Sequence, residues 1–132
     1  MGNGKDYKKF KNLVKEKGME EYVFLLGSKN PPYPYFKYFD FLFVPSRYEG
    51  KPIIVEEALL CNMPVIATRY SSVHEQINSD SGLIIENCEE AIYEFLENLN
   101  YENKLNFDKD KVKSNIDIEN AIKTNISFIF DN

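Results

Sequence analysis

The sequence contains no tryptophan, one histidine and only two cysteines, Cys61 and Cys88. Neither cysteine has a closely spaced partner or a nearby histidine, which argues against a disulfide framework and a zinc site. Both are therefore predicted to be free thiols in a reducing cytoplasm. No run of about 18 apolar residues occurs, so no transmembrane helix is predicted, and no signal peptide is expected. The many lysines, asparagines and isoleucines fit a bacterium with an AT-rich genome.

The charge balance is acidic, with a net charge of −5 at pH 7. An acidic chain is not attracted to the phosphates of a nucleic acid, so no nucleic-acid partner is expected. Residues 5–17 differ because they carry six lysines. This basic segment could face acidic lipid headgroups, in a peripheral contact at the inner face of the membrane. A solvated helix face is favoured, because that is the usual place for such charges.

Length and composition indicate one globular domain with a single core: 132 residues, 43% of them hydrophobic and 28% charged. Short apolar runs alternate with segments of helical periodicity. Strands are predicted at 23–26, 41–44, 65–67 and 82–85, and helices at 6–17, 35–38, 52–61, 73–77 and 89–99, with a further helical stripe at 118–129. Such alternation predicts an α/β fold, in which a parallel sheet has helices on both faces.

The most informative segment is 47–68, which places two carboxylates, Glu49 and Glu57, eight positions apart around a predicted helix start. Gly50 allows a tight loop, and Pro52 has the fixed φ that suits a first helical position. The first turn of this helix would present unpaired N–H groups and the positive end of the helix dipole, which favour an anion. Glu57 leans back toward the same end, and Glu49 approaches it from the loop. This arrangement suits sugar hydroxyls beside a phosphate.

The same helix is apolar on nearly every face, so we expect it to be packed between the sheet and other elements. At least one of Glu56 and Glu57 should then lie near the interior, where a carboxylate needs a partner. A ligand hydroxyl would serve as that partner. A neighbouring backbone group or an arginine could serve instead, and the composition of the helix alone favours such a structural partner.

The spacing Glu49-x7-Glu57, followed by Ala58 and residues 64–68, resembles the E-x7-E segment of the family 4, or group 1, retaining glycosyltransferases, which have the GT-B fold. Other segments are similar to the family in the same order: the Gly2-x-Gly4 pair, the apolar run 22–27 that ends in glycine, and residues 39–46, 81–85 and 116–121. The resemblance covers most of the chain. It implies that residues 1–132 are a single Rossmann-like domain, the C-terminal, nucleotide-sugar (donor) binding domain of a two-domain enzyme.

The resemblance also implies a role for each matching residue. The donor sugar would be bound by Glu49, Gly50, Lys51, Pro52 and Ile53, with the carboxylate of Glu49 on its hydroxyls. The nucleotide would be bound by Glu57, Ile54, Gly27 and Ser28, with Glu57 on the ribose and the last two lining the base pocket. Helix amides and cations, rather than a bound metal, would stabilise the leaving phosphate, so no metal or other cofactor is expected. Neither glutamate is our candidate for a general base.

The chain departs from the family pattern at two places. Many relatives have an aromatic residue and a glycine where this chain has Lys51 and Pro52, so one amide is lost and one cation is gained. Lys51 is therefore either a phosphate contact or a solvated loop lysine. The family's small residues followed by Pro-Glu correspond here to residues 71–75. They include His74, which is expected to be a helix residue with no special role.

Several parts of the family pattern are not found in the sequence. They are the arginine and lysine that neutralise the donor diphosphate, the first strand or strands of the domain, and the whole N-terminal acceptor domain. We therefore expect the isolated chain to bind nucleotide sugar weakly and to be inactive. An acceptor domain, in a longer protein or a separate chain, would complete a hexosyltransferase of surface polysaccharide or glycolipid synthesis. The alternative is a truncated or split non-catalytic module that acts through protein–protein contacts.

Overall fold

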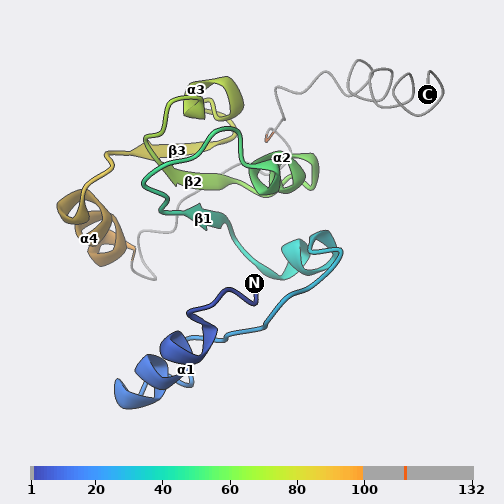
Figure 1. Ribbon diagram of the computed structural model, residues 1–132. Coiled ribbons are helices and arrows are strands. Elements are labelled where there is room, and N and C mark those ends of the chain that lie inside the picture. Colours follow the sequence, from blue (N-terminus) through green and yellow to red (C-terminus); the bar gives the residue numbers. More distant parts are fainter. Residues whose placement is uncertain (1, 100–111, 113–132) are drawn as a thin grey trace. The chain divides into compact units, whose positions relative to one another are not determined.

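The structure, a computed structural model, describes residues 2–99 and residue 112. Its elements in chain order are α1 (Tyr7–Glu16), the 3-10 helix η1 (Tyr33–Tyr38), β1 (Leu42–Val44), α2 (Ile53–Leu60), β2 (Val65–Thr68), α3 (Val73–Gln76), β3 (Gly82–Ile85) and α4 (Glu89–Asn98) (Figure 1). The chain divides into two compact units, Met1–Pro34 and Tyr35–Asn132. All three strands belong to the second unit.

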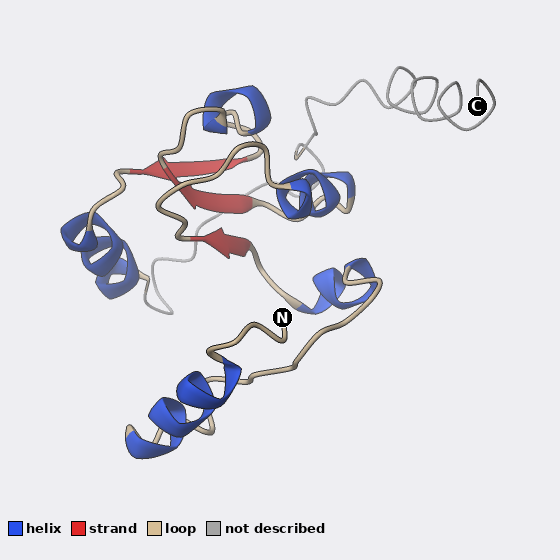
Figure 2. Cartoon of the chain, viewed as in Figure 1, coloured by secondary structure: helices blue, strands red, loops and turns tan. Residues whose placement is uncertain are grey.

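The sheet of the second unit is parallel throughout, with the strand order β1-β2-β3 (Figure 2). The central strand β2 pairs Val65 with Leu42 on one side and with Gly82 on the other. All four residues of β2 are buried, and its β-branched side chains suit a strand that is enclosed on both faces. Among the described strands, β1 and β3 each pair on one side only. The predicted parallel α/β architecture is confirmed.

Helices cover both faces of this sheet. Residues that pair across parallel strands point to the same face, so Val44 and Ala67 share one face while Phe43 and Ile66 share the other. The core of the first face is made by buried side chains of α2, β2 and α3, among them Val55, Leu59, Val65 and Val73. On the second face, Phe95 of α4 packs against Phe43 with 5.6 Å between the ring centroids. The predicted placement of helices on both faces is therefore confirmed.

Helix α2 is less enclosed than its composition predicts. Val55 is fully buried, but Ile53 is 71% exposed and Leu60 is 49% exposed. Ile53, Glu57 and Leu60 are spaced i, i+4 and i+7, so they form one stripe on the helix side away from Val55. The prediction that α2 is packed on nearly every side is wrong for this stripe, because no element in the described part of the chain covers it.

The strand predicted at 23–26 is not formed, and this part of the first unit is a loop in which Phe24 is 70% exposed. The composition of residues 23–26 favoured a strand, but a strand also needs an adjacent strand with which to form backbone hydrogen bonds. The described residues of the first unit contain no other strand. The loop is instead tied to the start of the chain, because the Gly2 N–H donates to the Gly27 carbonyl at 2.9 Å and the Tyr7 hydroxyl donates to the Leu25 carbonyl at 3.0 Å.

The remaining predicted elements are confirmed with small shifts of their ends, and the helix predicted at 35–38 is the second part of the 3-10 helix η1. The helical stripe at 118–129 and the family-like segment 116–121 lie outside the described residues. Among the helices of residues 2–99, none is both long enough and apolar enough to cross a bilayer.

Candidate functional site

A hollow of about 300 Å³ opens between the loop that follows β1 and the loop that follows β2. Its lining residues are Arg47, Tyr48, Glu49, Gly50, Tyr70 and Ser71, and we call it the Glu49 hollow. Open parallel sheets bind ligands beyond the carboxyl ends of their strands, which is where this hollow lies. Tyr48 is 93% exposed, whereas Tyr70 is only 6% exposed. The hollow thus combines a carboxylate and a serine hydroxyl with two aromatic rings, a set of groups that suits a polar ligand with apolar ring faces.

Polar side chains at the end of β2 and just after β3 hold the first part of the loop after β1. The buried hydroxyl of Thr68 donates to the Ser46 carbonyl at 2.7 Å. The side-chain amide of Asn87 lies within hydrogen-bonding distance of three carbonyl oxygens: Arg47 at 2.9 Å, Arg69 at 3.2 Å and Ser46 at 3.3 Å. The Asn87 side chain therefore links the segments that follow β1, β2 and β3. It holds in place the part of the loop after β1 that leads into the Glu49 hollow.

Replacing Asn87 with alanine is expected to destabilise the second unit by about 1 kcal/mol, because three carbonyl groups lose a donor that water replaces only in part. Amide hydrogen exchange at residues 46–50 should become faster. The matched control is Asn98→Ala, since the Asn98 amide donates to the Glu94 carbonyl of its own helix, at 2.8 Å, and not to the loop after β1. Equal effects of the two substitutions on the denaturation midpoint would contradict the inference that Asn87 stabilises the loop after β1.

Helix α3 holds the second part of the same loop. The Ser72 hydroxyl donates to the Gly50 carbonyl, and the side-chain amide of Gln76 donates to the Pro52 carbonyl at 3.3 Å. Pro52 is the residue that precedes the first turn of α2, with φ −66° and ψ 118°. The helix start predicted near residue 52 is confirmed, and no side chain caps its first turn. The N-terminal amides of α2 therefore keep the polarity that favours an anion.

The three acidic and basic side chains around the start of α2 differ in their partners. Lys51 pairs with Glu56 at 3.3 Å, and its side chain remains 55% exposed. Lys51 thus has a carboxylate partner within the protein, and its contact with a donor phosphate stays a prediction. Glu56 and Glu57 are both partly buried. Within residues 2–99 and 112, the Glu57 carboxylate has no hydrogen bond or ion pair, so the structural ion pair that its position allowed is not formed there.

Glu49 acts on Tyr70 through its charge. Burial, together with the negative charge of Glu49, raises the pKa of Tyr70 to about 12. The hydroxyl therefore keeps its proton at neutral pH and donates it to Oε1 of Gln76 at 3.1 Å. The Glu49 carboxylate itself accepts no hydrogen bond from any described residue, so it remains available to a donor from a ligand.

A surface cluster that the sequence did not predict lies beside the Glu49 hollow. Arg69 donates to Glu86 at 2.8 and 3.0 Å, and its Nη1 lies 2.7 Å from Nε2 of His74. The bond and charge of Arg69 lower the pKa of Glu86, and Glu86 raises the pKa of Arg69 in the same way. Since arginine only donates, Nε2 of His74 is the acceptor in this contact. His74 lies in helix α3, as expected, and its ring contacts Arg69.

The structure places the predicted site residues in three groups. Glu49 and Gly50 line the Glu49 hollow. Lys51, Pro52, Ile53 and Ile54 form the end of the loop and the first turn of α2, and Glu57 lies on the exposed stripe of that helix. The third group, Gly27 and Ser28, belongs to the first unit.

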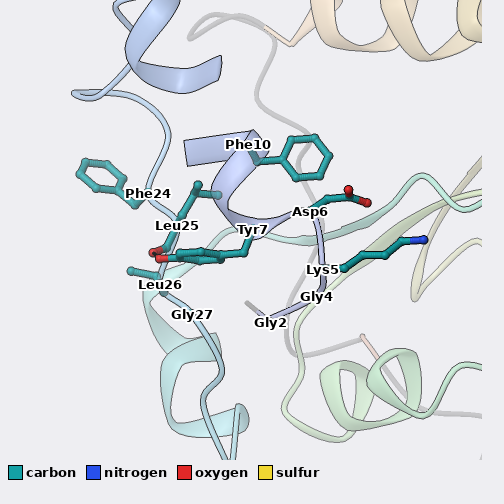
Figure 3. A pocket seen from close by; sticks show the side chains of 10 residues that line it. All are labelled: Gly2, Gly4, Lys5, Asp6, Tyr7, Phe10, Phe24, Leu25, Leu26 and Gly27. Carbon is teal, nitrogen blue, oxygen red and sulfur yellow. Dashed lines mark hydrogen bonds between the residues drawn. The ribbon is translucent and has the colours of Figure 1, made fainter. Parts of the chain in front are cut away.

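In the first unit, Gly27 has a positive φ of 69°, which favours glycine, and the Ser28 N–H donates to Oδ1 of Asn3 at 3.0 Å. Gly27 lines a separate hollow of about 380 Å³, in which the ring of Tyr7 lies toward Leu25 (Figure 3).

Acidic, histidine and cysteine side chains do not gather into a set of three able to hold a metal ion in the described part of the chain. That the activity needs no metal stays a prediction.

Sequence comparison finds similar proteins along most of the chain. The family model described as "Glycosyl transferases group 1" matches residues 1–111. An uncharacterized glycosyltransferase of Methanocaldococcus jannaschii is 35% identical over 106 residues, which are 74% of this chain and 30% of that protein. The N-acetylgalactosamine-N,N'-diacetylbacillosaminyl-diphospho-undecaprenol 4-alpha-N-acetylgalactosaminyltransferase of Campylobacter jejuni is 32% identical over 96 residues, which are 70% of this chain and 26% of that protein.

The fold is also found among solved structures. The lipopolysaccharide outer core galactosyltransferase WaaB, in its apo form, matches with a TM-score of 0.71 and 24% identity, over 84% of this chain and 33% of WaaB. The sucrose-phosphate synthase of Thermosynechococcus elongatus matches with a TM-score of 0.57 and 23% identity, over 81% of this chain and 26% of the synthase. The chain thus spans a third or less of the length of each of these four proteins.

Proposed function

Because this chain belongs to the group 1 glycosyltransferases, we propose that it is the donor-binding half of an enzyme that transfers a hexose from a nucleotide diphosphate sugar to an acceptor, with retention. The observation that carries the proposal is the Glu49 hollow beside the uncapped start of α2. A carboxylate and a helix N-terminus next to each other match the two chemical parts of such a donor, the hydroxyls of the sugar and the diphosphate.

The sugar is proposed to occupy the Glu49 hollow. Glu49 would accept hydrogen bonds from sugar hydroxyls, since its carboxylate has no other donor among the described residues. Tyr70 cannot compete as a donor, because its hydroxyl proton is already directed to Gln76. The exposed ring of Tyr48 offers an apolar surface to the C–H face of the sugar. Glu49 therefore orients the donor and is not proposed to transfer a proton.

The nucleotide is proposed to lie along the start of α2. The amides of Gly50, Ile53 and Ile54 and the dipole of the helix favour the diphosphate, and Lys51 adds a positive charge next to them. Glu57 would accept bonds from the ribose hydroxyls. For the base, the assignment to Gly27 and Ser28 is supported only by the family resemblance.

The acceptor is proposed to be a surface polysaccharide or a glycolipid. The Campylobacter relative is named as an enzyme that acts on a diphospho-undecaprenol-linked sugar, and WaaB is named as a galactosyltransferase of the lipopolysaccharide outer core. Binding of such an acceptor would require further protein, either in the same polypeptide or in a separate chain.

Titration with nucleotides tests the proposal. UDP, GDP, ADP and their hexose derivatives are added while the backbone amide signals are recorded. Shifts are expected at Gly50, Lys51, Ile53 and Ile54, since Pro52 has no amide proton. Glu57→Ala should abolish the response to nucleotide, whereas Glu75→Ala on the exposed side of α3 should leave it unchanged. If no nucleotide or nucleotide sugar shifts these signals at millimolar concentration, the donor-binding proposal is wrong and a non-catalytic module is the better interpretation.

A further inference from the structure

We propose that Gln76 is a positioning residue of the donor site, because its side-chain amide holds the Tyr70 wall of the Glu49 hollow and the start of α2 in one fixed arrangement. This inference rests on the proposed function. Gln76 is the last residue of α3 and does not line the hollow. It would therefore act through its neighbours and not by touching the donor.

The hydrogen bonds of Gln76 fix its orientation. The side chain is 3% exposed. Its Oε1 accepts from the Tyr70 hydroxyl at 3.1 Å, and its Nε2 donates to the Pro52 carbonyl at 3.3 Å and to Oε1 of Glu56 at 3.4 Å. A flipped amide would direct its oxygen at a carbonyl and a carboxylate, both of which only accept. Only one orientation of the amide therefore satisfies all three hydrogen bonds.

The network joins the two parts of the proposed site. Tyr70 forms a wall of the hollow assigned to the sugar, whereas Pro52 and Glu56 belong to the helix start assigned to the diphosphate. Glu56 also pairs with Lys51 at 3.3 Å, so the position of that cation depends on the same amide. Without the Gln76 amide, Tyr70 would no longer be connected to the start of α2. The buried Tyr70 hydroxyl would also lose its acceptor.

The test uses Gln76→Glu, which keeps the shape of the side chain but makes its donor depend on pH. The introduced carboxylate, when ionised, would still accept from Tyr70, but it would face Glu56 and the Pro52 carbonyl without a proton. Protonation would restore a donor. The other titratable groups nearby are Lys51 beyond Glu56, Glu49 beyond Tyr70, and the exposed side chains of His74 and Glu75 on α3 itself.

Relative to the wild type at the same pH, Gln76→Glu is expected to bind a nucleotide hexose roughly 10-fold more weakly near pH 8. The ratio of the variant's Kd to the wild-type Kd should return toward one as the pH is lowered and the new carboxyl group takes up its proton. Gln76→Met should bind more weakly at every pH. Ser79→Asp, which adds a charge at an exposed position, should match the wild type throughout. A role in folding alone would not produce this pH dependence of a binding ratio.

A second measurement does not depend on any ligand. In the free protein, the amide signals of Gly50 and Ile53 should shift together in Gln76→Glu and return together at low pH. Tyr70→Phe, which keeps the ring and removes one hydrogen bond, should shift the same signals and is the milder variant if the others unfold. Unchanged signals in Gln76→Glu, Gln76→Met and Tyr70→Phe would overturn the inference. If the wild type binds no donor but these signals still move together, the proposed function fails while the coupling through Gln76 stands.

Discussion

Replacing Gly82 with alanine is expected to destabilise the second unit by about 3 kcal/mol, at the upper end of the usual cost of overpacking. A Cβ atom at this position would overlap the backbone carbonyl oxygen of Val65 and would lie 3.1 Å from Cγ2 of Ile77. Backbone cannot rotate away as a side chain does, so β3 would have to separate from β2. The hydrogen bond from the Val65 N–H to the Ser81 carbonyl, now 3.1 Å long, would be lost with it.

The measurement is the denaturation midpoint, followed by circular dichroism. Gly50→Ala is the matched control, because a Cβ atom at Gly50 would meet no heavy atom within 4 Å. That change should alter the stability by no more than about 0.5 kcal/mol. If the two glycine variants unfold at the same denaturant concentration, the inference that β2 and β3 pack too closely at Gly82 to admit a side chain is wrong.

Glu49→Ala is expected to weaken the binding of a nucleotide hexose by roughly 10- to 100-fold, the range that corresponds to hydrogen bonds to a charged group. Binding of the free nucleotide should change little, because Glu49 is assigned to the sugar alone. Glu57→Ala should weaken the binding of both ligands, because both contain the ribose. Calorimetric titration of the two ligands against the two variants gives four values. Equal losses for both ligands in Glu49→Ala would refute the assignment of Glu49 to the sugar.

Glu49→Gln adds a readout that needs no ligand. Removing the charge takes away one of the two causes that raise the pKa of Tyr70 to about 12, so this pKa should fall while burial keeps it above the ordinary value of 10.0. A raised pKa of this acid stabilises the fold below pH 10, and the contribution is lost as the pH rises toward 12. In Glu49→Gln this loss should be smaller. The chain has nine tyrosines, so comparison with Tyr70→Phe identifies the transition in an absorbance titration.

The local pattern of the sequence was sufficient to predict the framework of the site. Each strand of the sheet is a short apolar run, and Pro52 marked the start of α2 correctly because its φ is fixed by the ring. The relation of Glu49 to that helix start also followed from spacing alone. These features depend on neighbours within one or two turns of chain, which a sequence displays directly.

The side chains that hold the site together could not be predicted in this way. Thr68 and Asn87 reach the loop after β1 from positions 22 to 41 residues away, and Gln76 reaches Pro52 from 24 residues away. Such contacts exist only after the register of the three strands is set. The error at 23–26 has the same origin, since the composition of a segment does not supply the strand that must pair with it.

The outer edge of strand β1 is a place where the backbone of another chain could pair with the sheet. Its side chains, Leu42, Phe43 and Val44, carry no charge that would repel an incoming chain, and one row of its backbone groups has no ladder partner among the described strands. That row is only three residues long and is bounded by Asp40 and Pro45, both of which hinder aggregation. A row this short and bounded in this way is a poor template for pairing with the backbone of a second chain.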